Sequence, residues 1–338
     1  MIKQRFTTIQ LTHGNGGKLM HELIQQVLVP RLHNPILAQL GDAARLPVTS
    51  DIAFTSDSFV VKPLMFRGGT IGTLAVCGSV NDLLMQGALP EYLSLSLIIE
   101  EGFPIALLKR IVDSVASAAR QARVRIVTGD VKVVEKGACD GIFINTSGVG
   151  KIISPRPYTV GRIRPGDCII VTGSIAEHGF SILASRAELR LGFSLKSDCA
   201  ALSGLLVPII RAEKGVVCMR DPTRGGIATT LNELSQAAGV GMRIHEKDIP
   251  VSPPVKAASE LLGIDPLYVA SEGRALIIAD RLSAARIVRK LRRHPLGRSA
   301  ALIGTVVAAH AARVVMKTAV GTERVVEMLS GEPLPRIC

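Results

Sequence analysis

The sequence predicts a two-domain protein that mixes helices and strands, of the α+β or α/β class. A chain of 338 residues is longer than one hydrophobic core usually organises. Strand-like and helix-like apolar patterns alternate along both halves. A stretch rich in proline and glycine, residues 150–166, separates the two halves and marks the domain boundary. We therefore divide the chain into an N-terminal segment, a first domain, a second domain and a tail: residues 1–40, 41–152, 153–329 and 330–338.

The elements of the first domain follow from hydrophobic periodicity. A helical pattern comes first, with apolar residues at positions 19, 23, 24, 27 and 28. A mostly apolar helix is expected at 69–86 and an amphipathic helix at 107–122. Strands are expected in four segments: 52–61, 92–99, 123–127 and 141–149.

The second domain also alternates strands with helices, whereas the tail shows neither pattern. Apolar segments in it predict five strands, several separated by helices: 168–171, 216–219, 275–279, 301–307 and 313–317. The tail, 330–338, holds one glycine and two prolines without a helical or strand period, so we expect an extended or mobile arm.

Composition and charge exclude several classes of function. The most apolar long stretch, 70–89, is interrupted by Asn81, Asp82 and Gln86, and no apolar signal core follows Met1, so we expect a cytoplasmic protein that spans no membrane. The net charge is +12, and much of it lies in the segment 281–298. That segment is either a solvated helix face or a contact for an acidic protein. No aromatic residues interleave with it, which argues against a nucleic-acid surface.

The six cysteines do not form a metal-binding pattern. No Cys-x-x-Cys is present, and the nearest two are 19 residues apart, so a zinc or iron–sulfur site is not expected. Five lie in or beside apolar runs and read as core thiols. The sixth, Cys338, is the last residue of the chain. A thiol at the end of an extended arm is a candidate for chemistry.

Four carboxylates of the first domain are candidates for a magnesium site. Asp42 follows a glycine, Asp57 lies within a strand, Asp82 interrupts an apolar helix, and Asp130 ends a strand. The polar pair Asn81-Asp82 inside an apolar helix is costly unless something satisfies it, and Mg²⁺, which prefers carboxylate and phosphate oxygens, would do so. The alternative is that the four are unrelated caps and turns.

Two glycine-rich segments are candidates for binding phosphates. Asp221-Pro222-Thr223-Arg224-Gly225-Gly226 follows a strand and opens a helix, where backbone N–H groups approach an anion and Arg224 adds a charge. Gly14-Asn15-Gly16-Gly17 could fold over phosphates as a lid. A capped turn and a flexible loop are the respective alternatives.

Three further residues are candidates for acid–base work, although each is also compatible with a surface position. Glu272 follows the apolar segment 267–270, which reads as a strand, and precedes a glycine, so it is the best candidate for a general base. His178 lies at an expected helix start, and Lys132 follows Asp130.

Taken together, the motifs resemble the ATP-binding superfamily of aminoimidazole ribonucleotide synthetase over nearly the whole chain. The terminal Pro335-Arg336-Ile337-Cys338 resembles that of the HypE family of hydrogenase maturation factors within it. The motifs that carry the wider resemblance occur in the same order: Gly14-Asn15-Gly16-Gly17, Val80-Asn81-Asp82-Leu83-Leu84-Met85-Gln86-Gly87-Ala88, Thr128-Gly129-Asp130-Val131-Lys132, Asp221-Pro222-Thr223-Arg224-Gly225-Gly226 and Ser271-Glu272-Gly273.

This resemblance implies a PurM-like fold, a homodimer whose first-domain sheets form a β-barrel, and ATP between the domains. It implies Mg²⁺ at Asp42, Asp57 and Asp82, although the Gly41-Asp42 pair departs from relatives with two adjacent acids. It also implies that the carbamoyltransferase HypF places a carbamoyl group on Cys338. ATP-dependent dehydration would then make a thiocyanate, and a HypC–HypD complex would accept the cyanide for [NiFe] hydrogenase.

Two rival functions have different consequences. A small-molecule synthetase or kinase of the same superfamily is the nearest rival, although aminoimidazole ribonucleotide synthetase itself would have no use for a C-terminal thiol. Selenophosphate synthetase is disfavoured because no cysteine precedes Cys77, whereas that enzyme commonly has a reactive one near the glycine-rich start. A non-enzymatic scaffold would present Cys338 to partners without turning over ATP.

Overall fold

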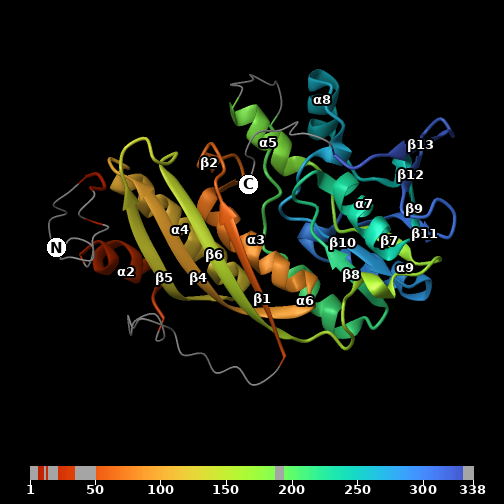
Figure 1. The fold of residues 1–338 in the computed structure, drawn as a ribbon, viewed down its shortest axis with the longest axis horizontal. Helices are drawn as coiled ribbons and strands as arrows, with labels where there is room; N and C mark the ends of the chain where they lie inside the picture. Colours follow the sequence, from red (N-terminus) through yellow and green to blue (C-terminus); the bar gives the residue numbers. More distant parts are fainter. Residues whose placement is uncertain (1–6, 11–12, 14–21, 35–50, 187–193, 330–338) are drawn as a thin grey trace.

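The computed structural model describes residues 7–10, 13, 22–34, 51–186 and 194–329. Two sheets organise this part of the chain, and they lie side by side along its long axis (Figure 1). A short π-helical turn, Ile24–Leu28, and α2, Val29–Leu32, precede the first sheet and confirm the helical pattern expected there. None of the described helices combines the length and apolarity needed to cross a membrane.

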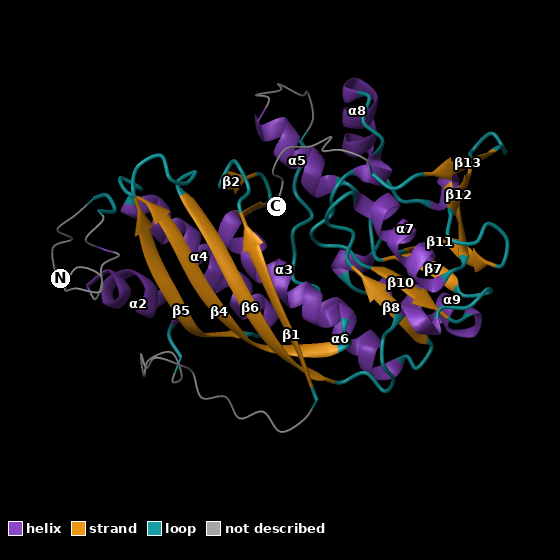
Figure 2. Ribbon diagram, viewed as in Figure 1, coloured by secondary structure: helices purple, strands orange, loops and turns teal. Residues whose placement is uncertain are grey.

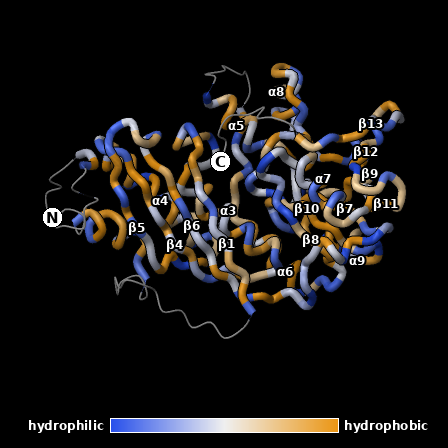
Figure 3. The backbone as a smooth tube through the Cα atoms, in the orientation of Figure 1, coloured by the Kyte–Doolittle hydropathy of each residue, from blue (hydrophilic) through white to orange (hydrophobic). Residues whose placement is uncertain are grey.

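The first sheet has four strands in the order β1-β6-β4-β5, and two helices cover one of its faces (Figure 2). The strands are β1 (Ile52–Phe59), β4 (Ala88–Glu100), β5 (Arg125–Val134) and β6 (Ile142–Ile152). The helices are α3 (Ile71–Met85) and α4 (Ile105–Ala122), and the short strands β2 (Met65–Phe66) and β3 (Gly69–Thr70) lead into α3. Buried and partly exposed residues alternate along β4 and β6, which suits a sheet covered on one face. Figure 3 shows that the strands of this sheet carry both hydrophobic and hydrophilic residues.

The second sheet has seven strands in the order β13-β12-β9-β11-β7-β10-β8, and only the β12–β9 pair is parallel. Mostly antiparallel pairing is the α+β arrangement. Its strands are β7 (Cys168–Val171), β8 (Val216–Arg220), β9 (Gly241–His245), β10 (Leu276–Ala279), β11 (Ala301–Val307), β12 (Val314–Lys317) and β13 (Glu323–Val326). Its helices are α5 (Glu177–Arg186), α6 (Ser203–Ala212), α7 (Gly226–Ala238), α8 (Pro253–Leu262) and α9 (Arg281–Leu291).

The second sheet separates two hydrophobic clusters. On β7, Ile170 packs into the cluster that holds α6, α9 and the first domain, whereas Ile169 packs into the cluster under α7 and α8. This division follows from the two-residue period of a strand, because successive side chains point to opposite faces. Since the first cluster runs from α4 through α3 and α6 to α9, the two domains share one core.

Most predicted elements are present, with three differences. The chain forms the short strands β2 and β3 and the strands β9 and β13, which we did not predict. Residues 267–270 are not a strand, because Pro266–Tyr268 is a 3₁₀ turn and irregular backbone follows it. Asp130 does not end a strand, because β5 continues to Val134. Gly129 permits this continuation, since a Cβ there would lie 2.2 Å from the backbone oxygen of Leu95 on β4.

Candidate functional site

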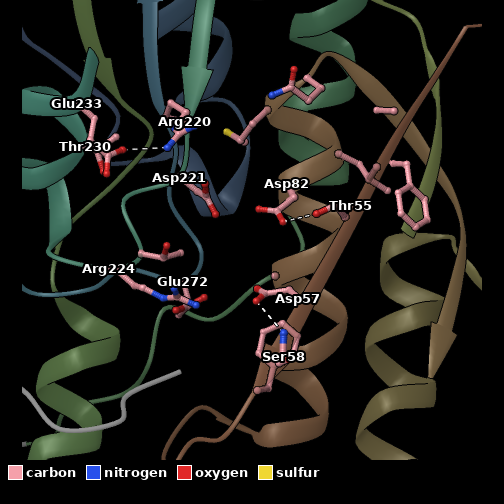
Figure 4. Close-up of a pocket in the computed structure, with 18 of the residues that line it drawn as sticks. Thr55, Asp57, Ser58, Asp82, Arg220, Asp221, Arg224, Thr230, Glu233 and Glu272 are labelled. Atoms are coloured by element: carbon pink, nitrogen blue, oxygen red, sulfur yellow. Dashed lines mark hydrogen bonds and ion pairs between the residues drawn. The ribbon is translucent and has the colours of Figure 1, made fainter. Parts of the chain in front are cut away.

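The site is a pocket of about 710 Å³ between the first domain and the second. A cavity of this size is in the range that holds a nucleotide-sized ligand. Strand β1 and helix α3 form one wall, and the end of β8, the start of α7 and the loop before β10 form the other. Figure 4 shows four carboxylates around a common space. They are Asp57, Asp82, Asp221 and Glu272.

The wall from the first domain contributes Asp57 and Asp82. Thr55 Oγ1 donates to Asp82 Oδ2 at 2.7 Å, which ties β1 to α3, and Asp57 Oδ1 accepts from the backbone N–H of Ser58 at 2.8 Å. Burial raises the pKa of both carboxyls, and the charge of Asp57 raises the pKa of Asp82 further. Two half-buried carboxylates therefore face the pocket under mutual repulsion.

The wall from the second domain contributes Asp221 and two arginines. Burial, and then the charge of Asp82, raise the pKa of Asp221 to about 7. Arg220 Nη2 lies 2.9 Å from Glu233 Oε2 at the outer end of this wall. Arg224 follows on the loop into α7 and lines the same pocket, where its charge lowers the pKa values of Asp57 and Asp82 and partly offsets the effect of burial. Acidic and basic groups thus line the same cavity, as a bound cation and a bound polyanion together would require.

The carboxylate set fits a magnesium ion that shares its ligands with phosphates. In the described ranges, no three acidic, thiol or imidazole side chains converge closely enough to hold a metal by themselves. Mg²⁺ is usually held by one or two carboxylates, with phosphate oxygens and water completing its octahedron. Asp57 and Asp82 fit that requirement, because both carboxyls line the pocket and a bound cation would offset the burial that raises their pKa values.

Helix α7 presents an uncapped N-terminus beside the pocket. Its N-cap residue, Gly225, makes no side-chain hydrogen bond, and Gly225 and Gly226 both have positive φ, 67° and 60°. A Cβ on Gly226 would lie 2.5 Å from the backbone oxygen of Leu267, so glycine is required by space as well as by φ. The free N–H groups and the helix dipole make this turn suitable for an anion.

Glu272 is the buried carboxylate of the site. Its residue is 3% exposed, and its Oε1 makes no hydrogen bond in the described structure. Burial, followed by the charges of Asp221 and Asp198, raises the pKa of Glu272 well above its ordinary value. A buried carboxyl without a partner at one oxygen is unusual, and it is typical of functional sites.

The other candidate catalytic residues lie away from this pocket. His178, at the start of α5 as predicted, is fully buried, and its Nδ1 lies 2.8 Å from Ser197 Oγ. Asp130 and Lys132 lie on β5, at the sheet edge opposite β1, where they form an exposed ion pair at 3.8 Å. Their assignments stay predictions. The remaining candidates lie outside the described residues: Gly14, Asn15, Gly16, Gly17, Asp42 and Cys338.

Sequence reasoning missed several residues that line the pocket. Thr55 could have been found, because it lies two positions before Asp57 on an alternating strand and therefore shares its face. Arg220 and Glu233 pair across the turn between β8 and α7, and no spacing signal in the sequence indicated this. The apolar end of the pocket was also missed, and it is lined by Ile52, Phe54, Leu83, Met85 and Ile152.

Comparison with protein families gives two matches in sequence order. The model of the N-terminal domain of AIR synthase related proteins matches residues 40–152. The model of the C-terminal domain of the same proteins matches residues 164–317. Together they cover well over half of the chain, so the resemblance seen in the motifs and the two-domain fold are confirmed.

Individual relatives match over nearly full length. The carbamoyl dehydratase HypE of Rhodobacter capsulatus is 48% identical over 98% of this chain and 98% of its own. A solved structure of the hydrogenase maturation protein HypE in complex with ATP is 44% identical, with a TM-score of 0.95, and covers 98% of this chain and 100% of that one. A chain in a solved HypE–HypF complex is 43% identical, with a TM-score of 0.80, over 90% and 99%. This chain belongs to the HypE family of carbamoyl dehydratases.

Proposed function

We propose that the chain uses ATP and Mg²⁺ to dehydrate a carbamoyl group on the sulfur of Cys338, giving a thiocyanate that supplies cyanide for the iron of [NiFe] hydrogenase. One observation carries this proposal: the interdomain pocket gathers carboxylates, a cationic side chain, an uncapped helix N-terminus and a buried acid. Relatives named carbamoyl dehydratase and a HypE structure in complex with ATP support it.

The chemistry balances with ATP as the only co-substrate. The carbamoyl oxygen is a poor leaving group, so it first attacks the γ-phosphorus of ATP, with release of ADP and of one N–H proton. The C–O bond then breaks, phosphate leaves with the oxygen, and the second N–H proton is removed. The products are S–C≡N, ADP and phosphate, and the carbamoyl group has lost the elements of one water.

Different residues of the pocket would have different roles in this reaction. Asp57 and Asp82 would hold Mg²⁺, which offsets the negative charge of the phosphates when it is bound. The N–H groups at the start of α7 and the guanidinium of Arg224 would orient the phosphate chain. The apolar end of the pocket suits the base of the nucleotide, because Leu83, Met85 and Ile152 offer aliphatic side chains to a flat apolar surface.

Glu272 is the group that we assign to proton removal. It lies on the pocket wall, and its Oε1 is buried without a hydrogen-bond partner in the described structure. A base with a raised pKa accepts a proton strongly once it is ionised. His178 is the alternative, but it does not line the pocket, and it packs edge-on against Phe66.

The proposal extends to partners. The solved HypE–HypF complex supports HypF as a partner. HypF would supply the carbamoyl group, and a HypC–HypD complex would accept the cyanide. We also expect the protein in the cytoplasm, where ATP is available to it.

We further propose that two copies pair through the uncovered face of the first sheet. This face carries exposed apolar side chains, Phe54 (68% exposed) and Ile98 (41% exposed). Ile98→Glu should therefore give a monomer in light scattering. Leu282→Glu, at a 91% exposed position on α9, should leave the dimer intact. A dimeric Ile98→Glu protein would exclude this face.

ATP turnover tests the enzyme against a scaffold that only presents Cys338. Carbamoylated protein should release about one ADP per carbamoyl group when Mg-ATP is added. Protein that has not been carbamoylated should release none above background. Equal ADP release from both forms, or none from either, would exclude the dehydratase activity of the chain itself.

A further inference from the structure

Asn81 is a buried amide at the junction of the two domains. It lies on α3, directly before Asp82, and is 1% exposed. Its Nδ2 donates to the backbone oxygens of Ala200 and Glu272, both at 3.1 Å. Its Oδ1 accepts from the backbone N–H of Leu202 at 2.9 Å. One side chain of the first domain therefore binds two separate segments of the second.

The polarity of Asn81 is satisfied by protein backbone. We expected from the sequence that a metal would satisfy the pair formed by Asn81 and Asp82. The structure instead divides the pair: Asp82 turns into the pocket, and both donor hydrogens of the Asn81 amide are used by carbonyls of the second domain. The other buried residues of α3 are mostly apolar, so these hydrogen bonds are what distinguishes an asparagine at this position.

The segment that carries Glu272 depends on such contacts for its position. It lies between the 3₁₀ turn Pro266–Tyr268 and β10, and it has no helix or strand hydrogen bonds of its own. The backbone N–H of Glu272 donates to Asp198 Oδ1 at 3.0 Å, while its backbone oxygen accepts from Asn81. The backbone of Glu272 is thus held by hydrogen bonds on both sides of its Cα, and the bond to its backbone oxygen comes from Asn81 of the first domain.

We propose that Asn81 is a positioning residue, which fixes the Glu272 carboxylate relative to Asp82, its own neighbour on α3. Asn81 and Asp82 are consecutive residues of α3, so this helix would set the distance between the metal-binding Asp82 and the proton-accepting Glu272. The proposal rests on the proposed role of Glu272 as the base. A misplacement of about 1 Å can cost on the order of 10²-fold in rate, so loss of this contact should slow the chemistry.

Asn232 provides a matched control for the loss of two buried hydrogen bonds. It is 4% exposed on α7, and its Nδ2 also donates to two backbone oxygens, those of Ala228 and Val326, both at 2.9 Å. It does not line the pocket. Asn81→Ala and Asn232→Ala should both lower the thermal midpoint, because each removes two hydrogen bonds from a buried amide to backbone oxygens.

The two variants should differ in the rate of the chemical step. In single-turnover assays with carbamoylated protein at saturating Mg-ATP, Asn81→Ala should be slower by roughly 10–10²-fold, with the Kd for Mg-ATP within about threefold of wild type. Asn232→Ala should react at the wild-type rate. Equal rates for the two variants would overturn the proposal. Asn81→Leu, which has a similar side-chain shape but neither donates nor accepts a hydrogen bond, serves if Asn81→Ala does not fold.

A double-mutant cycle shows whether Asn81 acts through Glu272. In the Glu272→Gln background, Asn81→Ala should cost less than about twofold, because the group that it positions has already been removed. A full additional loss would overturn the positioning role while leaving Glu272 as the base. A wild-type rate for Glu272→Gln alone would instead remove the base assignment and the positioning role together, so the two failures are distinguishable.

Discussion

Thr55 Oγ1 lies 2.7 Å from Asp82 Oδ2, which joins strand β1 to helix α3 at the mouth of the interdomain pocket. The hydroxyl occupies one oxygen of the carboxylate and fixes its orientation. The other oxygen is left to face the space that Asp57 and Asp221 also border. A carboxylate oriented in this way suits a metal ligand, because outer hydrogen bonds of this kind position metal-binding groups.

Asp82→Asn should weaken the binding of Mg-ATP without unfolding the protein. The amide keeps an oxygen for Thr55 but removes the negative charge, so we expect a loss of about 10–10²-fold in affinity, or about 1.4–2.8 kcal/mol. Isothermal titration calorimetry with Mg-ATP measures this. Asp113→Asn, at a carboxylate of α4 that pairs with Arg31 and does not line the pocket, is the control and should bind normally. Unchanged affinity in Asp82→Asn would remove Asp82 from the metal site.

Glu272→Gln should slow dehydration much more than it weakens ATP binding. A general base typically contributes about 10²–10⁴-fold to a rate, and Glu272 is not assigned to the metal. Single-turnover assays on the same carbamoylated preparation should compare Glu272→Gln with His178→Ala. If the first reacts at the wild-type rate and the second does not, the base is His178.

The sequence predicted residues of the site that stand out in their local pattern, and it did not predict contacts between distant segments. Asp57 and Asp82 were found because a carboxylate in a strand or an apolar helix stands out, and both do face the pocket. Asn81 stood out for the same reason, but its partners, Ala200 and Glu272, lie 119 and 191 residues away. Hydrophobic periodicity carries no information about contacts at such separations.

The predicted elements differed most where tertiary contacts override local pattern. The apolar run at 267–270 reads as a strand, yet the structure uses it as packing around the start of α7, where Val269 O lies close to Gly226. The strand β13 is half exposed and polar, so it gave no apolar signal, and its pairing with β12 defines it. The sequence pattern also did not predict the order of strands in the first sheet, which places β5 at the edge opposite β1.

Glu213 should make stability depend on pH in acid. It is 1% exposed at the end of α6, and its oxygens lie 2.9 Å from Arg286 Nη2 and 2.6 Å from Lys290 Nζ on α9. Burial opposes its ionisation, but the hydrogen bonds from Arg286 and Lys290 outweigh that and hold the pKa of Glu213 below its ordinary value of 4.5. Arg286 and Lys290, two basic residues of the segment 281–298, therefore have a structural role.

Because that pKa is lowered by folding, the ionised Glu213 stabilises the protein above pH 4.5, and the effect is lost as the pH falls through the folded-state value. Glu213→Gln should lower the thermal midpoint at pH 7, and the gap from wild type should narrow below pH 4.5. Glu260→Gln, at an exposed position of α8, should show no such gap. A gap for Glu213→Gln that stays constant into acid would contradict the ion-pair account.

The central claim, that Cys338 carries the group which is dehydrated, is tested most directly by the mass of the C-terminal peptide. Protein carbamoylated by HypF should yield a peptide whose added group sits on Cys338. After Mg-ATP is added, that peptide should lose the mass of one water, and Cys338→Ala should carry no adduct before or after. A carbamoyl mass that persists through ATP turnover, or a dehydrated adduct on another cysteine or in Cys338→Ala, would contradict the account.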